Sequence, residues 1–416
     1  MNILMLGRWL PPPRQPVKST RDYQFARQLA RTHQITLAFV NDSSDAAGSI
    51  SALRSEFGDL EFASVSRAWK SLAGAISLAT GESCTLSYYR SEALRTRLAD
   101  RLARTPYDAV LVTSSSMIQY ALDVDQAIPL ITDFGSVESE WWAAQSERSG
   151  FPPGRFFRTE AERLRWAETA AARRSAHCVV ATRAALRVVQ ALSPKGPVTL
   201  IPNGVDVEFF GTRPRVNPEP TVVLTTGGAG HAADGSGLLR QVVPMVRARV
   251  PRVRFVVSVR DRLAESRSIA AMRGVEIAGP TTDLRTLFHS HAVAAVAETP
   301  NVDLRSGVLE PMAAGVPVIG TPRLGDQLGE KGAEALVVVE SARDFGLRIS
   351  ELLEDGTLRE QLGARGRAYV SAHHAWSVVT SKLAEILEGL AKSERTRGRL
   401  IPVAGDVPDR TEESGR

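Results

Sequence analysis

Glu310 lies in the segment whose residue types point most clearly to chemistry. Gly307 precedes it, and Gly315-Val316-Pro317 follows it before an apolar run that ends at Gly320. This order predicts a glycine that opens a helix, an acid in the first turn, and a turn into a buried strand. Helix N-termini favour carboxylates, and doubly wound folds bind ligands at the carboxyl ends of their strands. A ligand-binding acid is the favoured interpretation, and a capping glutamate is the alternative.

A glycine cluster, Gly227-Gly228-Ala229-Gly230, lies between an expected strand and an expected helix. From Gly228 onward it fits G-x-G-x-x-A, in which bare backbone can approach a pyrophosphate. Dinucleotide binding also needs an acid about 20 residues further on, and there is none around Ala248. A P-loop is excluded because Ser236, rather than Lys followed by Ser or Thr, comes after the last glycine. NAD binding and a simple tight turn remain the alternatives.

The sequence lacks the residue patterns that several other chemistries require. No G-x-S-x-G motif occurs, and Ser114-Ser115-Ser116 has no convincing histidine partner. His373 and His374 are adjacent, so a helix cannot point both into one metal site. Two cysteines, Cys84 and Cys178, cannot form a disulfide framework or a zinc cage, which fits a reducing compartment.

The elements that must position these residues alternate between short apolar strands and longer amphipathic helices, which is typical of parallel α/β folds. In the first half we expect strands at Asn2–Leu6, Ile35–Phe39, Ala109–Val112, Pro129–Thr132, Cys178–Ala181 and Thr199–Ile201. Helices are expected at Ser19–Arg31, with Ser19 or Thr20 as the cap, and at Glu92–Ala103, Arg158–Arg174 and Arg183–Leu192.

The alternation begins again in the second half, after the breaker-rich segments Ser193–Pro197 and Thr212–Pro220. Strands are expected at Thr221–Thr226, Arg254–Val259, Val275–Ile277, Ala292–Ala297, Val316–Gly320 and Ala335–Val339. Helices are expected at Gly235–Arg249, Ala342–Glu354, Thr357–Ala372 and Ser377–Leu390. We therefore predict an N-terminal domain at 1–195, a second domain at 198–375, a crossover helix at 376–390 and a disordered tail at 391–416.

Composition limits the class of protein. The chain has 416 residues, 43% hydrophobic and 23% charged, which is a globular balance long enough for two or three domains. The net charge of +5 is small and spread along the chain, so we expect no nucleic-acid partner. We find no secretory signal and no apolar run long enough to cross a bilayer. We therefore expect a cytoplasmic protein.

A resemblance to a known family rests on two segments. Leu309–Val318 resembles the donor-site segment of glycosyltransferase family 4, whose members have the two-domain GT-B fold. Ile201–Asp206, with Phe209-Phe210, is similar to the same family's entry to its second domain. In the first half, Asp133-Phe134, Val137–Glu140, Trp142 and the helix that holds Glu160 and Arg163 resemble bacterial exopolysaccharide sugar transferases. The resemblance covers nearly everything from Met1 to Leu390.

The resemblance implies two doubly wound domains facing a central cleft, with a nucleotide-sugar bound by the second. Glu310 matches the acid that hydrogen-bonds the ribose, and Arg305 matches a residue that meets the diphosphate. The remaining donor-binding positions are backbone or apolar: Gly227, Gly228, Gly230, Gly307, Val308 and Leu309. The family reaction retains anomeric configuration and needs neither metal nor cofactor.

The sequence departs from the family at several charged positions. Val302 stands where the first acid of the Glu-x(7)-Glu motif belongs, and Gly228 and Asp234 stand near the positions of the usual Arg and Lys. Gly307 replaces a common lysine. A single arginine stabilises a leaving diphosphate less than two cations do. A catalytically weak GT-B scaffold protein is therefore the alternative function.

The acceptor side is expected in the first domain. Lys18 and Arg21 match basic residues of the first loop, although Gln15-Pro16 replaces its glycine, and Asp133 and Glu138 face the same side. The resemblance implies a lipid-linked saccharide acceptor for surface polysaccharide assembly, with UDP- or GDP-sugar as donor. Arg155-Phe156-Phe157-Arg158 and Trp141-Trp142 could form a basic, aromatic surface for peripheral membrane contact. The alternative is that the charged residues of this region form an ordinary solvated surface and its aromatic rings belong to the core.

Overall fold

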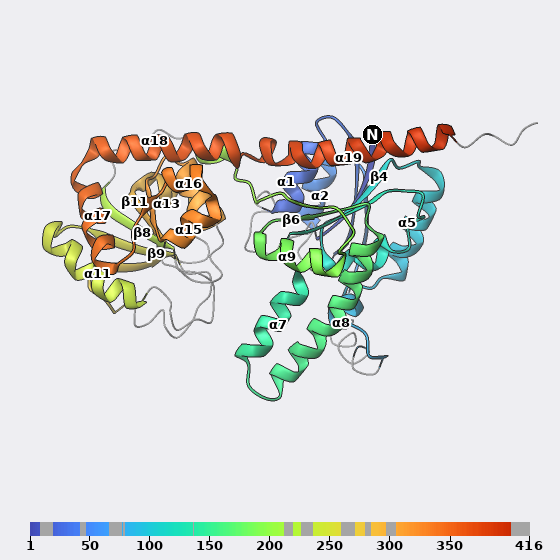
Figure 1. The fold of residues 1–416 in the computed structure, drawn as a ribbon, viewed down its shortest axis with the longest axis horizontal. Helices are drawn as coiled ribbons and strands as arrows, with labels where there is room; N and C mark the ends of the chain where they lie inside the picture. The colour runs from blue at the N-terminus through green and yellow to red at the C-terminus, as the bar shows by residue number, and fades with distance from the viewer. Residues whose placement is uncertain are drawn as a thin grey trace, which may run out of the picture.

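A computed structural model describes residues 1–8, 20–41, 47–65, 77, 80–135, 137–211, 219–225, 236–258, 271–278, 284–296 and 305–400. Two α/β bodies lie side by side along the long axis of the molecule, and a long C-terminal helical segment runs past both (Figure 1). The two doubly wound domains predicted from the sequence are confirmed.

The N-terminal domain is built on seven described parallel strands in the order β3-β2-β1-β4-β5-β6-β7. They are β1 (Asn2–Leu6), β2 (Gln34–Asn41), β3 (Leu60–Ser64), β4 (Ala109–Val112), β5 (Leu130–Gly135), β6 (His177–Val180) and β7 (Val198–Leu200). The helices are α1 (Arg21–Leu29), α2 (Ala47–Phe57), α4 (Cys84–Tyr88), α5 (Glu92–Arg104), the short turns η2 (Ser115–Met117) and α6 (Ile118–Ala121), α7 (Glu138–Arg148), α8 (Pro153–Arg174) and α9 (Arg183–Leu192). The sequence analysis missed α2, β3 and α7.

The C-terminal domain has six described parallel strands in the order β10-β9-β8-β11-β12-β13. They are β8 (Glu219–Thr225), β9 (Arg254–Ser258), β10 (Val275–Ala278), β11 (His291–Val296), β12 (Val318–Gly320) and β13 (Val337–Val338). The helices are α10 (Val207–Gly211), α11 (Ser236–Arg249), α13 (Leu284–Ser290), η3 (Arg305–Leu309), α14 (Glu310–Ala313), α15 (Pro322–Leu328), α16 (Glu330–Glu334), α17 (Ala342–Glu354), α18 (Gly356–His373) and α19 (Trp376–Leu400).

Both sheets reverse their strand order once, between β1 and β4 in the first and between β8 and β11 in the second. Chain connections leave in opposite directions at such a switch point, which opens a crevice at the carboxyl ends of the two strands. Strands β1 and β4 are buried along nearly their whole length, as strands covered on both faces must be. We therefore expect one ligand-binding crevice in each domain.

The C-terminal crossover helix predicted from the sequence is confirmed. Trp376, Val379, Leu383 and Leu387 of α19 are buried in the core of the N-terminal domain, and Trp376 meets Phe25 edge to face. The helix does not end at Leu390 but continues to Leu400. The tail predicted from Ala391 thus begins inside a helix, because the segment is rich in Lys, Glu and Arg and its first proline is Pro402. Residues 401–416 lie outside the described part of the chain.

Candidate active site

The crevice of the N-terminal domain contains an acid that the sequence analysis did not single out. Asp22, in the first turn of α1, accepts a hydrogen bond of 3.4 Å from the Arg8 amide, just beyond β1, and another from Thr113, just beyond β4. Burial, followed by the negative charge of Asp133, raises the pKa of Asp22 to about 7. Asp22 therefore places a carboxyl group that titrates near neutral pH at the switch point. Its position at a helix N-terminus after the first strand was the available signal.

Two of the predicted acceptor-side residues, Arg21 and Asp133, form a bidentate ion pair. Arg21 Nε lies 2.7 Å from Asp133 Oδ2, and Nη2 lies 3.2 Å from Oδ1. The other guanidinium protons go to the segment between the domains, namely to Ile201 O, Pro202 O and Asn203 Oδ1. All five N–H donors of Arg21 are thus engaged, so the side chain ties β5 to the interdomain segment. A direct contact with an acceptor stays a prediction.

A third predicted acceptor-side residue, Glu138, begins α7. It accepts a hydrogen bond of 3.1 Å from Oγ of Ser114, a residue that follows β4. Beside it, the fully buried Glu168 of α8 accepts hydrogen bonds from Ser115 Oγ and from the amide and hydroxyl of Ser139. Burial raises the pKa of Glu168. These two acids fix the serine turn after β4, which the sequence had left without a role.

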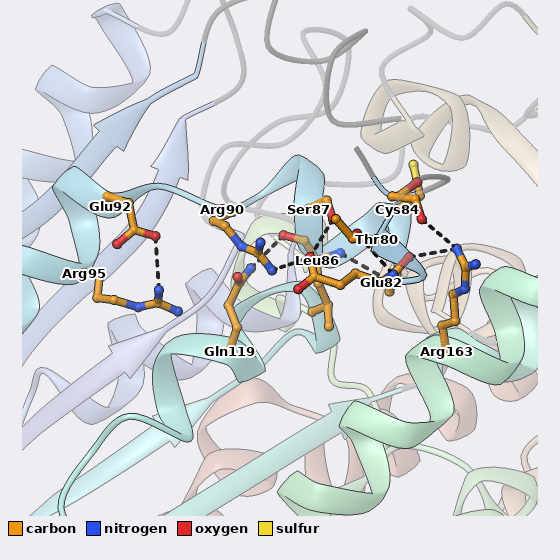
Figure 2. A network of polar contacts seen from close by, with 12 residues as sticks. Thr80, Glu82, Cys84, Leu86, Ser87, Arg90, Glu92, Arg95, Gln119 and Arg163 are labelled. Atoms are coloured by element: carbon orange, nitrogen blue, oxygen red, sulfur yellow. Dashed lines mark hydrogen bonds and ion pairs between the residues drawn. The ribbon is translucent and has the colours of Figure 1, made fainter. Parts of the chain in front are cut away.

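A second buried glutamate of α8 holds the segment in front of α4. Glu160 accepts hydrogen bonds from Ser83 Oγ and from the amides of Cys84 and Thr85 at 2.7–2.9 Å. Arg163, one turn further on, donates to Ser77 O and Glu82 O, and Glu82 pairs with Arg90 (Figure 2). Glu160 and Arg163, two of the first-half residues that carry the family resemblance, therefore fix α4 against α8 through hydrogen bonds.

In the C-terminal domain, Glu310 lies after β11, one of the two switch strands. It is only 6% exposed and begins α14, directly after the π-helical turn η3. Its chain neighbours Val308, Leu309 and Met312 are also buried. Gly315 takes a φ of +71° to end α14, and the chain turns into β12, as the sequence predicts. The placement fits an acid that serves a ligand rather than the surface.

Several predicted donor residues cannot be placed. The glycine cluster with Gly227, Gly228 and Gly230, together with Lys18, Gln15-Pro16, Asp234 and Val302, lies outside the described residues. Arg305 begins η3, but its side chain is likewise not described. Gly307 is buried within η3. The strand β8 ends directly before the glycine cluster, which therefore follows the second switch strand of this domain. The donor roles of these residues stay predictions.

The chain passes between the two domains twice, at residues 203–205 and 374–376, and these two segments pack on each other. Val205 N donates to His374 O at 2.8 Å, and the two segments form a short parallel bridge. A Cβ at Gly204 would lie 2.6 Å from the Trp376 ring, so only glycine allows this approach. Burial lowers the pKa of His374, which contacts Asn203 O and Tyr369 rather than a second histidine. Within the described ranges, no group of His, Cys, Asp and Glu has the arrangement of a metal site.

Comparison with known proteins identifies the C-terminal half. Residues 220–355 match the family model described as "Glycosyl transferases group 1". The matched range begins in β8, ends after α17 and contains Glu310. Residues 220–355 are therefore similar to a glycosyltransferase group 1 domain.

Two curated relatives are glycosyltransferases as well. They are the "GDP-mannose-dependent alpha-(1-6)-phosphatidylinositol monomannoside mannosyltransferase" proteins of Mycobacterium tuberculosis strains CDC 1551 and H37Rv. Each is 29% identical over 230 residues, which cover 49% of this chain. The chain spans 59% of the length of these relatives.

Solved glycosyltransferase structures share the whole fold. Sucrose-phosphate synthase from Thermosynechococcus elongatus superposes with a TM-score of 0.60 at 15% identity, over 94% of this chain and 100% of that one. Anabaena HepE in complex with UDP-glucose gives 0.58 at 14% identity, with the same coverage. TarM gives 0.62 at 10% identity, over 93% and 98%. The fold is GT-B, and with the domain match these likenesses support a glycosyltransferase.

Proposed function

We propose that this protein transfers a sugar from a nucleotide-sugar donor to a saccharide acceptor. The observation that carries the proposal is the buried Glu310, which lies after a switch strand of a domain that matches the glycosyl transferases group 1 model. A carboxylate at the carboxyl end of a switch strand can accept hydrogen bonds from the two hydroxyls of a ribose.

On the donor side, Glu310 holds the ribose. Arg305 and the backbone amides of Gly227–Gly230 and Gly307 meet the diphosphate, whose negative charge grows as the sugar leaves. HepE binds UDP-glucose and the mycobacterial relatives are named as GDP-mannose-dependent, which supports a UDP- or GDP-linked donor.

The proposed reaction retains anomeric configuration without a metal. The bond from the anomeric carbon to the diphosphate breaks as a bond to the acceptor oxygen forms on the same face. The proton of the acceptor hydroxyl passes to the leaving phosphate, so no side chain needs to act as a general base.

On the acceptor side, the crevice around Asp22, Asp133 and Glu138 receives the saccharide. We place this acceptor on a lipid, in exopolysaccharide or other surface polysaccharide assembly at the cytoplasmic face of the membrane. The name of the mycobacterial relatives, which specifies a phosphatidylinositol monomannoside acceptor, supports a glycolipid. No described helix has the length and apolar character needed to cross a bilayer.

The proposal is tested by incubating the full chain with a panel of UDP- and GDP-sugars, first alone and then with an extract of lipid-linked saccharides. The expected result is sugar release from one donor and faster transfer when the lipid extract is present. Tight donor binding without turnover on any acceptor would favour a scaffold role for a GT-B protein that lacks its usual cations. Failure to bind any nucleotide-sugar would refute the proposal.

A further inference from the structure

The helices α7 and α8 form a hairpin that projects from the N-terminal domain, away from the α18–α19 segment (Figure 1). Large apolar side chains are exposed along its outer half. Phe151, in the turn between the helices, is 84% exposed, Trp141 is 56% exposed and Phe156 is 38% exposed. The interpretation of the aromatic residues here as core aromatics is therefore wrong for Trp141 and Phe156.

Trp141 and Phe156 belong to one contiguous group of rings, and Phe151 lies in the turn before α8. The Trp142 ring lies 4.8 Å from Trp141, 6.4 Å from Phe156 and 5.5 Å from Phe157, measured between ring centroids. Trp142 and Phe157 are half-buried between the helices and support the exposed rings. We call Trp141, Trp142, Phe151, Phe156 and Phe157 the aromatic patch. A rigid set of exposed rings is a feature of interaction sites, since isolated surface apolar residues are common but clusters are not.

Basic residues surround the patch. From Glu147 to Arg158 the chain carries three arginines, Arg148, Arg155 and Arg158, against one glutamate. Arg155 and Arg158 are exposed on the first turns of α8. Aromatic rings that reach the level of lipid headgroups, together with arginines that attract anionic lipids, are the chemistry of an interfacial membrane contact.

The hairpin is also rigidly fixed at its base. The buried Glu160 of α8 accepts three hydrogen bonds from residues 83–85, and the buried Glu168 accepts one from Ser115 after β4 and two from Ser139 of α7. A surface held in this way keeps its orientation relative to the acceptor side, because Glu138 at the base of α7 accepts a hydrogen bond from Ser114 in the turn that follows β4. Glu168 joins Ser139 of α7 to Ser115 of the same turn.

We propose that the aromatic patch docks the protein on an anionic phospholipid surface. This proposal rests on the proposed function in one respect, namely that the acceptor is lipid-linked. Trp141, Phe151 and Phe156 enter the interface, and Arg155 and Arg158 lie over the headgroup phosphates. A second copy of this chain fits less well, since a two-fold contact through the patch would bring the arginines of both copies together.

The test is sedimentation of the full chain with vesicles of phosphatidylcholine, with and without phosphatidylglycerol. We expect binding to the anionic vesicles that weakens with salt. The double variant Trp141→Ala/Phe151→Ala should bind at least about tenfold more weakly, because two rings no longer leave water. These side chains are exposed, so an unchanged melting temperature will confirm that the variant folds.

Matched controls separate this site from general stickiness. Trp166 on α8 is 76% exposed but nine residues beyond Phe157, and Trp166→Ala should bind like wild type. Arg155→Gln/Arg158→Gln should lose the preference for anionic vesicles, whereas Arg187→Gln/Arg343→Gln, which removes two exposed arginines of α9 and α17, should keep it.

Three results would overturn the proposal: no binding of wild type to anionic vesicles, an equal loss in Trp166→Ala, or a patch-dependent dimer in solution. Nucleotide-sugar binding is measured on the same proteins without vesicles. If vesicle binding is intact and nucleotide binding is absent, the transferase proposal fails and the docking site stands. The reverse pattern removes the docking site alone.

Discussion

The carboxyl edges of the two sheets are built differently. In the N-terminal domain, Arg21 pairs with Asp133 and donates to the interdomain segment, and Asp133 also accepts from the Gly135 amide at the end of β5. Glu138 and Glu168 accept hydrogen bonds from the serine turn after β4. In the C-terminal domain, the described part of the edge carries one buried acid, Glu310, among apolar residues on η3 and α14. The first edge is positioned by a polar network and the second by packing.

The difference suggests how the proposed chemistry is divided. A polar network can fix a site without its members touching the substrate, whereas a buried acid that begins a helix at the carboxyl end of a switch strand is placed to meet a ligand. We therefore expect substitutions in the first edge to reduce stability, and substitution of Glu310 to reduce donor binding with little effect on stability.

The largest effect is expected for Arg21→Met. The change leaves the buried Asp133 carboxylate without its cation and three acceptors of the interdomain segment without a donor. Removal of one partner of such an ion pair costs about 3–5 kcal/mol of unfolding free energy. Urea unfolding measures this loss of unfolding free energy. Arg27→Met is the control, since Arg27 on the same helix is 38% exposed and makes only longer ion contacts, and it should cost less than about 1 kcal/mol. Equal losses of unfolding free energy in Arg21→Met and Arg27→Met would contradict a stabilising role for the network.

A smaller effect is expected for Glu168→Gln. The amide keeps the shape of the side chain but turns an N–H donor toward Ser115 or Ser139, so buried donors lose an acceptor. We expect a loss of about 1–3 kcal/mol in the free energy of unfolding. Glu162→Gln, an exposed position of the same helix, should be neutral. If both variants are neutral, the serine turn after β4 does not depend on Glu168.

The smallest effect should appear as a pH dependence at Asp22. The folded-state pKa is raised from 3.8 to about 7, so the folded protein loses stability as pH rises through this window. Because Asp22 is partly exposed, solvent screening limits the difference to about 1–2 kcal/mol. Asp22→Asn should therefore equal wild type near pH 4 and exceed it in stability above pH 7. Thermal unfolding across this range checks it, and parallel curves for both proteins would rule out the raised pKa.

The fold was largely predictable from the sequence. Buried parallel strands such as Asn2–Leu6 read as unbroken apolar runs, and the cap at Thr20 and the turn at Gly315 carry local signals. Helix α7 was missed because Glu138–Arg148 has no clear apolar stripe, since its rings form the exposed patch. The end of α19 was missed because a charged sequence with few apolar residues was taken for disorder.

The site was less predictable because its contacts join residues far apart in the chain. Arg21 reaches Ile201 and Glu168 reaches Ser115, and no spacing rule connects such pairs. The raised pKa of Asp22 depends on Asp133, which only the fold brings near. Glu310 could be found because a glycine, an acid and a turn lie within one short segment, so that local order alone marks the position.

The most direct test of the account is calorimetric titration of nucleotide-sugars into wild type, Glu310→Gln and Glu330→Gln, an exposed glutamate of the same domain. Loss of charge-assisted hydrogen bonds to the ribose should weaken binding about ten- to a hundredfold in Glu310→Gln. The Glu330→Gln variant should bind like wild type, and all three proteins should unfold at similar temperatures. Equal affinity of Glu310→Gln and wild type, or no nucleotide binding by either, would contradict the account.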